Sequence, residues 1–307
     1  MSETSPGHSP APHPAATPTA IRLEERALIA VAGADANHFL GNLLTADIAG
    51  LTPGSGRLAA LLTPQGKIIA DMLVFDASDD EPLYLIDVAR AFAEELARKL
   101  TQYRLRAAVS IDLLPTETAI VACLDAPAIT GEDFYTFPDP RDSALGQRLY
   151  GPAEAIRAAT AHLRQGEPAT YHARRIALGI PEGGRDYLTV DTFPHEANLD
   201  QLGAVDFRKG CYIGQEIVSR MEHRGTARTR ALCVRFLNGF GVLSGAEIIA
   251  GEKILGKIGE CVGDRSIGFI RLDRLEEAAV AGEVVSSGGV PIAIEKPHYA
   301  RFVTRSV

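Results

Sequence analysis

The residues best suited to chemistry lie together in the octapeptide 209–216, which reads Lys-Gly-Cys-Tyr-Ile-Gly-Gln-Glu. Gly210 and Gly214 bracket Cys211 and an aromatic residue, and glycine is favoured where a backbone takes a positive φ or lets a ligand come close. After Gly214 the apolar spacing predicts a helix that ends at Gly225. Cys211 would then precede a helix N-terminus, where the positive end of the helix dipole favours a thiolate. The alternative is an inert cysteine buried in a tight turn, because free cysteine is among the most buried residue types.

The composition describes an ordinary globular protein that must position this loop. The chain has 307 residues, of which 46% are hydrophobic and 23% charged, enough for two or three domains with a sizeable core. The net charge of −8 argues against a general binder of nucleic acid or anionic membranes, since those surfaces reward a basic excess. The cysteines lie far apart and form no Cys-x-x-Cys pair, which excludes a zinc module and a disulfide framework. We therefore expect free thiols in a reducing cytoplasm.

The amino-terminal segment carries no signal for a membrane. It lacks a basic stretch followed by an apolar one, and no apolar run in the chain approaches the roughly 20 residues that cross a bilayer. Residues 1–20 are rich in Pro, Ala, Ser and Thr, a composition that cannot form a core. We expect a disordered tail over 1–20 and no membrane partner.

Two kinds of pattern follow along the ordered chain. Residues 33–47 read as an amphipathic helix with Asp35 as its N-cap. Short apolar runs typical of strands then alternate with helical stretches, at 58–62, 68–75, 84–88, 107–113 and 118–124. This alternation predicts an α+β fold with a ferredoxin-like layer over about 55–165. From 226 to 307 the runs are separated by Gly-rich turns, which is typical of a β-barrel.

The octapeptide resembles the signature of the YgfZ-type folate-binding proteins, the CAF17-like relatives of the glycine-cleavage aminomethyltransferase whose mitochondrial members serve iron-sulfur cluster assembly. The 33–47 helix, with its Gly-x-Asp-Ala start and Thr-x-Asp end, is similar to a segment of the same superfamily. The resemblance implies three domains around a central hole. Two intertwined folate-binding subdomains would span 21–225, and a C-terminal β-barrel would span 226–307.

A folate site can be stated in physical terms. The pterin ring presents an N–H beside an amino group, and one carboxylate can accept both hydrogens in a strong bidentate arrangement. Glu196, in the run Phe-Pro-His-Glu-Ala, matches the position of the pterin-binding glutamate of the aminomethyltransferases. His195 and His223 flank the motif without an evident second ligand, so we expect hydrogen-bonding roles for them and no metal site of the protein's own.

The carboxylates of the folate tail require cations. Arg175 and Arg220 are candidates, as is Lys209 within a basic stripe on one side of the motif helix. Tyr212 is predicted to be an aromatic anchor in the folate cleft or at a domain seam. A stripe of this kind could also meet an acidic partner protein or tRNA, but the acidic chain leads us to expect no direct tRNA binding.

Asp71 aligns with the second member of an acidic pair that the aminomethyltransferases place beside the reacting folate. The first member is replaced by Ala70, which puts methylene transfer in doubt because an acidic contribution to proton transfer is lost. Cys211 has two functional interpretations. One thiolate could join a shared [2Fe-2S] cluster, which normally takes four ligands and so needs a partner's cysteines or a second copy of the chain. It could instead form a transient disulfide or be oxidised.

The resemblance implies a tetrahydrofolate-binding accessory protein for the assembly or repair of iron-sulfur clusters in client enzymes, with an indirect effect on tRNA modification. Its partners would be folate and iron-sulfur carrier or client proteins, with Cys211 at the working surface. The alternative is an enzyme, a folate-dependent aminomethyl or one-carbon transferase, which Asp71 keeps open.

Overall fold

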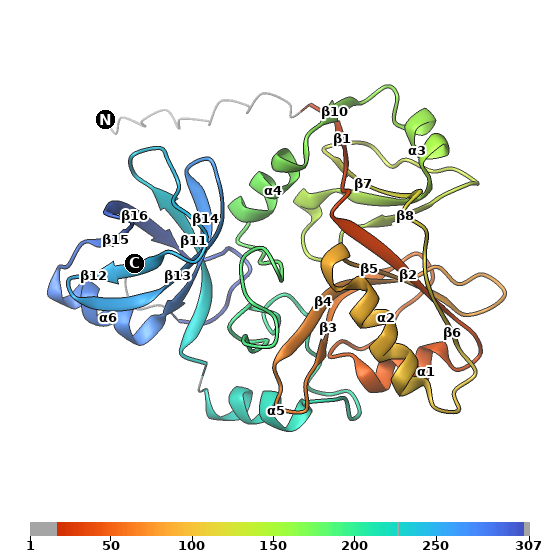
Figure 1. The fold of residues 1–307 in the computed structure, drawn as a ribbon, viewed down its shortest axis with the longest axis horizontal. Helices are drawn as coiled ribbons and strands as arrows, with labels where there is room; N and C mark the ends of the chain where they lie inside the picture. The colour runs from red at the N-terminus through yellow and green to blue at the C-terminus, as the bar shows by residue number, and fades with distance from the viewer. Residues whose placement is uncertain (1–16, 226, 304–307) are drawn as a thin grey trace, which may run out of the picture.

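A computed structural model describes residues 17–225 and 227–303 of the chain (Figure 1). Most of the expected disordered tail lies outside the described residues. Its last two positions do not fit the expectation, because strand β1 (Thr19–Arg22) begins at Thr19. Ala20 is buried in β1 and packs in an apolar cluster with Cys123 and Leu149, so burial of apolar surface orders this segment earlier than composition indicated.

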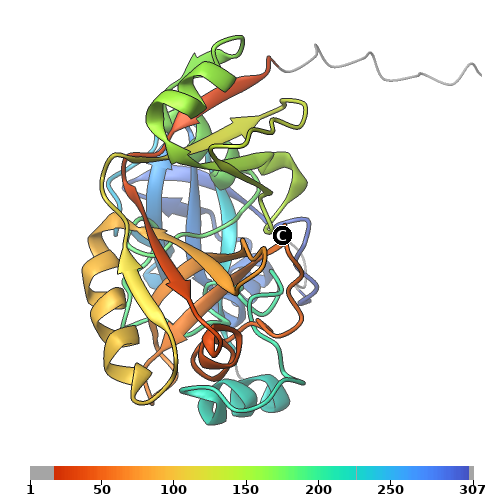
Figure 2. The same cartoon turned by 90° about the vertical axis from the view of Figure 1, so that its right-hand side faces the viewer.

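The first of two five-stranded sheets is antiparallel. Its strands, in spatial order, are β3 (Gly56–Leu62), β4 (Ile68–Asp76), β5 (Leu83–Ala89), β2 (Arg26–Ala32) and β6 (Ser110–Leu113). Helices α1 (Ala36–Leu43) and α2 (Arg90–Arg104) pack on one face of it (Figures 1 and 2). Side chains alternate along the strands: Ile29 joins the core under the helices, whereas Leu28 joins the core on the opposite face.

The second sheet lies beside the first. One of its strands precedes the strands of the first sheet in the chain, and the other four follow them. Its order is β10 (Arg164–Gly166), β1, β7 (Thr118–Leu124), β9 (Gln147–Pro152) and β8 (Tyr135–Pro138), with α3 (Ala153–Ala159) packed against it. Consecutive strands β1 and β2 enter different sheets. Residues 55–165, where a ferredoxin-like layer was expected, therefore supply strands to both sheets.

A closed six-stranded barrel forms the third part, as expected from the Gly-rich turns. Its strands, in order, are β11 (Thr229–Phe236), β14 (Arg265–Arg271), β13 (Lys253–Val262), β12 (Glu247–Ala250), β15 (Val285–Ser287) and β16 (Val290–Glu295). A helix that the strand-like spacing did not reveal, α6 (Leu272–Ala281), packs on β13 and β14. The expected α+β fold with a C-terminal barrel is confirmed.

A central segment joins the barrel to the sheets. It contains α4 (Pro168–Ala177), a long irregular stretch, and α5 (Gln215–Arg224) (Figure 1). Tyr171, Tyr187 and Tyr212 of this segment share one apolar core with the sheet residues Leu28 and Phe75. This shared core fixes the central segment on the sheets. No helix among residues 17–225 and 227–303 is long and apolar enough to cross a membrane.

Candidate functional site

The motif loop lies on the turn between β3 and β4. Gly214 has a φ of +80°, and a Cβ on it would meet the carbonyl oxygen of Thr63 at 2.6 Å. Only glycine tolerates both the left-handed conformation and this close approach. Helix α5 then starts at Gln215 and ends against Gly225, also left-handed at φ +56°, as the sequence predicts.

Lys209 anchors the start of this loop to helix α1. Its Nζ atom donates hydrogen bonds to the carbonyl oxygens of Gly41, Leu44 and Ala46, at 2.6, 2.7 and 2.7 Å. Carbonyl groups at a helix C-terminus lack partners within the helix and favour a cation. Burial lowers the pKa of Lys209 to about 8, whereas these three acceptors favour the ammonium form. The ammonium group is thus committed to the protein's own backbone.

Cys211 and Tyr212 lie on opposite sides of the loop. Cys211 is exposed, whereas Tyr212 is only 6% exposed and packs in the shared core. Burial raises the pKa of the Tyr212 hydroxyl to about 12, and the oxygen has no hydrogen-bond partner among the described residues. The other cysteines are buried or half-buried. An accessible thiol therefore stands on a loop that Tyr212 and Lys209 hold from below.

A cavity of about 510 Å³ lies between the central segment and the barrel. Glu196 lines it, and one of its oxygens, Oε2, accepts a hydrogen bond from the backbone N–H of Phe193 at 2.8 Å. The rings of Tyr187 and Phe269 also line it, with centroids 5.5 Å apart. A volume of this size and a mixture of aromatic walls with a few polar groups suit a small organic ligand.

Asp71 stands behind the wall of this cavity. It is 6% exposed, and its Oδ1 atom accepts a hydrogen bond from the N–H of Gly183 at 3.0 Å. Burial and the nearby charge of Glu182 raise the pKa of Asp71. The hydroxyl of Tyr187 lies beside this carboxylate, and because Tyr187 lines the cavity it connects Asp71 to the cavity wall. Asp71 and Glu196 are thus brought to the same region from strands and loops far apart in sequence.

The proposed tail-binding arginines lie elsewhere. Arg175 is fully buried and bonds to Asp186 and to the carbonyl of Ile180. Arg220 is exposed on α5 and pairs with Glu216 at 2.7 Å. Neither lines the cavity. The expected basic stripe is also broken, because Lys209 faces α1 instead of solvent.

Residues of the barrel and of the irregular turn in the central segment complete the cavity. The spacing of these residues in the sequence did not predict that they share a site. Lys257, Phe269 and Arg271 come from β13 and β14, and Tyr187 follows the irregular Gly-Gly-Arg-Asp turn. A second cavity, of about 640 Å³, lies on the other side of that turn and shares Arg185 with the first. Only the folding of the barrel against the central segment brings these residues to one place.

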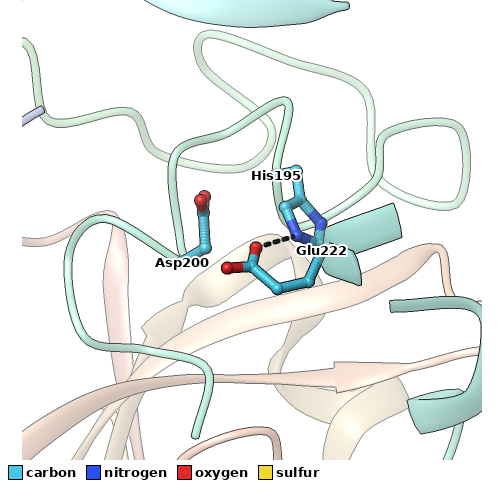
Figure 3. Close-up of side chains that lie close together, drawn as sticks. All are labelled: His195, Asp200 and Glu222. Atoms are coloured by element: carbon cyan, nitrogen blue, oxygen red, sulfur yellow. Dashed lines mark hydrogen bonds and ion pairs between the residues drawn. The ribbon is translucent and has the colours of Figure 1, made fainter. Parts of the chain in front are cut away.

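His195, Asp200 and Glu222 form a cluster of possible metal ligands, with their ligand atoms within 4.8 Å of one another (Figure 3). The expectation that His195 lacks a second potential ligand is therefore wrong, because folding brings α5 to it. However, Asp200 already forms an ion pair with Arg230, since its Oδ1 lies 2.7 Å from Arg230 Nη1. A metal-bound histidine usually donates its other ring N–H to an acceptor, and the buried Nδ1 of His195 has none among the described residues. The 3.1 Å contact from His195 Nε2 to Glu222 Oε2 is therefore a hydrogen bond that ties α5 to the segment carrying Glu196.

The chain is similar to known proteins in both its sequence and its fold. Residues 23–124 match the GCVT N-terminal domain, and residues 228–302 match the CAF17 C-terminal β-barrel domain. The aminomethyltransferase of the glycine cleavage system from Bartonella henselae superimposes with a TM-score of 0.75 over 93% of this chain and 87% of its own, at 17% identity. That likeness concerns the fold.

Two curated relatives, one fungal and one human, are named as the mitochondrial iron-sulfur cluster assembly factor IBA57. The fungal protein is named as a homolog of that factor. The protein from Pyricularia oryzae is 37% identical over 70% of this chain and 57% of its own length. The human protein is 28% identical over 94% of this chain and 88% of its own. This chain thus spans a little over half the length of the fungal relative.

The predicted cytoplasmic location is wrong on this comparison, because these relatives are named as mitochondrial. Scattered free thiols indicate only a reducing environment. They do not tell one reducing compartment from another.

Proposed function

Since the chain belongs to the CAF17-like branch of the aminomethyltransferase superfamily, we propose that it is a folate-binding accessory protein for assembling or repairing iron-sulfur clusters in client enzymes. The observation that carries this proposal is the separation of two sites. Glu196 lines the cavity between the central segment and the barrel, whereas Cys211 stands exposed on the motif loop. A ligand and a partner protein could therefore be bound at the same time.

The cavity supports the folate part of the proposal. Glu196 is held by the Phe193 N–H through one oxygen, which fixes the carboxylate for the paired N–H groups of a pterin. Tyr187 and Phe269 supply flat apolar surface for the ring. Both features match a ligand with a polar edge on an aromatic face.

The exposed loop supports the cluster part. A [2Fe-2S] cluster normally needs four ligands, and Cys211 is the one exposed cysteine among the described residues. A cluster held here would therefore be a shared cargo, with the remaining ligands from a carrier or client protein. The anchored loop would keep the thiol presented while that partner docks, which limits the entropy lost on binding.

Thermal stabilisation by tetrahydrofolate tests the first part, because a ligand that binds only the native state raises the melting temperature. We expect equal stabilisation of the wild type and of Cys211→Ala. In cells, only the wild type should sustain the activity of iron-sulfur enzymes. Cys261→Ala, which removes a half-buried thiol, is the matched control and should behave as the wild type. If Cys211→Ala sustained those enzymes fully, the proposed role of the Cys211 thiol would be rejected.

A second candidate function is a folate-dependent aminomethyl or one-carbon transferase. Asp71 favours it, because its buried carboxylate with a raised pKa lies behind the cavity wall and such groups serve in proton transfer. The test mixes the protein with tetrahydrofolate and aminomethyl donors and looks for methylene-tetrahydrofolate. Product that depends on Asp71 would support the transferase; no product with any donor would count against it.

A further inference from the structure

The cavity beside Glu196 has walls of opposite charge. The wall from the central segment carries the carboxylates of Glu196 and Asp191, and the barrel wall carries Lys257 and Arg271. Arg185 also borders the cavity but is engaged by three carboxylates, the closest being Glu260 at 2.8 Å. The barrel wall thus supplies the cations that are least committed.

Strand register explains why the two barrel cations share this wall. Lys257 of β13 is paired directly with Phe269 of β14, and Arg271 lies two residues further along β14. Residues paired across a ladder, and residues two apart on one strand, project from the same face of a sheet. Phe269 lines the cavity. The register therefore sets both cations beside the aromatic surface.

Lys257 is available for a ligand. Its side chain is exposed and has no hydrogen-bond or ion-pair partner among residues 17–225 and 227–303. Arg271 is partly engaged, since its Nη2 lies 2.5 Å from Asp273, and its side chain is 32% exposed. By contrast Lys253, on the same strand, pairs with Glu277 at 2.9 Å and lies outside the cavity lining.

We propose that Lys257, assisted by Arg271, binds the carboxylates of the folate tail, so that the ligand spans the cavity from Glu196 to the barrel. This inference rests on the proposed folate function and assigns to the barrel a role that the motif arginines were expected to fill. A pterin on Glu196 directs the rest of the molecule toward the opposite wall. Each added glutamate brings further negative charge to that wall, so folates with several glutamates bind more tightly than those with one.

Three probes test the assignment: 5-formyltetrahydropteroyl amide, which has neither a glutamate nor a free carboxylate, 5-formyltetrahydrofolate, and its triglutamate form. Affinities are measured by calorimetry for the wild type and for Lys257→Met, with Lys253→Met as the control on the same strand. We expect Lys257→Met to weaken binding of the monoglutamate about fivefold, as for loss of one solvent-exposed ion pair. The advantage of the triglutamate should shrink, while binding of the tail-free probe and all binding by Lys253→Met stay unchanged.

Glu196→Gln separates this inference from the function on which it rests. It should weaken all three probes alike, because each carries the pterin. If Glu196→Gln weakened binding but Lys257→Met and Arg271→Met left monoglutamate and triglutamate affinities unchanged, the barrel wall would not hold the tail and the inference would be overturned. If the wild type bound none of the probes, the folate function itself would fall, and the inference with it.

Discussion

Gly214 of the motif lies directly against Gly66 in the turn between β3 and β4: a Cβ atom on Gly214 would come within 3.0 Å of the Cα atom of Gly66. Gly66 is also left-handed, at φ +78°. Two glycines thus let two backbones approach more closely than any side chain permits. The exposed thiol of Cys211 is presented from a loop that rests on this contact.

The first prediction concerns Gly214. Gly214→Ala should lower the free energy of unfolding by about 2–4 kcal/mol. The new Cβ atom would clash with the backbone of Thr63 and Gly66, and alanine is strained at this positive φ. Gly210→Ala, in the same loop, has nothing within 4 Å of its new Cβ and no positive φ, and should change stability by less than about 0.5 kcal/mol. Urea denaturation of both variants measures this. Equal losses would mean that the loop does not depend on the Gly66 contact.

The second prediction concerns the anchor of the loop. Lys209→Met keeps the length of the side chain but removes three hydrogen bonds from an ammonium group, and should cost about 2–3 kcal/mol of stability. The loosened loop should also let Cys211 react faster with a disulfide reagent, measured against the background of Cys211→Ala. The exposed neighbour Arg208 provides the control: Arg208→Met should leave both quantities unchanged. An unaltered thiol rate in Lys209→Met would show that the anchor does not position Cys211.

The local part of this architecture follows from sequence. Gly214 and Gly225 bracket a helical apolar spacing, and α5 occupies the residues between them. Glycine at a helix end reports a backbone conformation directly. The barrel likewise follows from runs of apolar residues between Gly-rich turns.

The partners of the charged residues could not be predicted in this way. The acceptors of Lys209 are backbone carbonyls at the end of α1, more than 160 residues away, and a carbonyl has no sequence signal. Arg175 was expected to serve a ligand, but α4 packs against both the second sheet and the barrel, and this buries it. Lys257 reaches the cavity only because the barrel closes against the central segment. Tertiary packing decides each case.

The third prediction is an acid-sensitive stability that depends on Glu182. Burial raises the pKa of this carboxyl, but the guanidinium groups of Arg26 and Arg175 outweigh burial and hold it well below its usual range. A carboxylate with a lowered pKa in the folded state stabilises the fold above its unfolded value of 4.5, and this stability is lost as the pH falls below that value. Glu182→Gln should therefore cost about 3–5 kcal/mol at pH 7, since it removes a buried carboxylate from Arg26 and Arg175 and leaves them with fewer compensating charges.

The measurement is the melting temperature between pH 3 and pH 8. Glu182→Gln should be least stable relative to the wild type at neutral pH and should approach it as the pH falls. Glu216→Gln, on the surface of α5, should follow the wild type at every pH. A constant difference between Glu182→Gln and the wild type would contradict the linkage.

The fourth prediction has the opposite sign and concerns Asp71. Burial, together with the charge of Glu182, raises its pKa in the folded protein, so its ionised form opposes folding above that pKa. The penalty is relieved as the pH falls through the folded pKa toward the unfolded value of 3.8. Asp71→Asn keeps an oxygen for the Gly183 N–H and cannot ionise. It should be more stable than the wild type at pH 7, by on the order of 1 kcal/mol.

The same variant bears on chemistry. If Asp71 serves only the fold, Asp71→Asn should bind 5-formyltetrahydrofolate with unchanged affinity and sustain iron-sulfur enzymes in cells. Loss of either property from a protein that has become more stable would mean that the ionised carboxylate is kept for function at a cost to folding. A decrease in stability at pH 7 would instead show that the contact with Tyr187 requires the charge, and that burial does not oppose ionisation here.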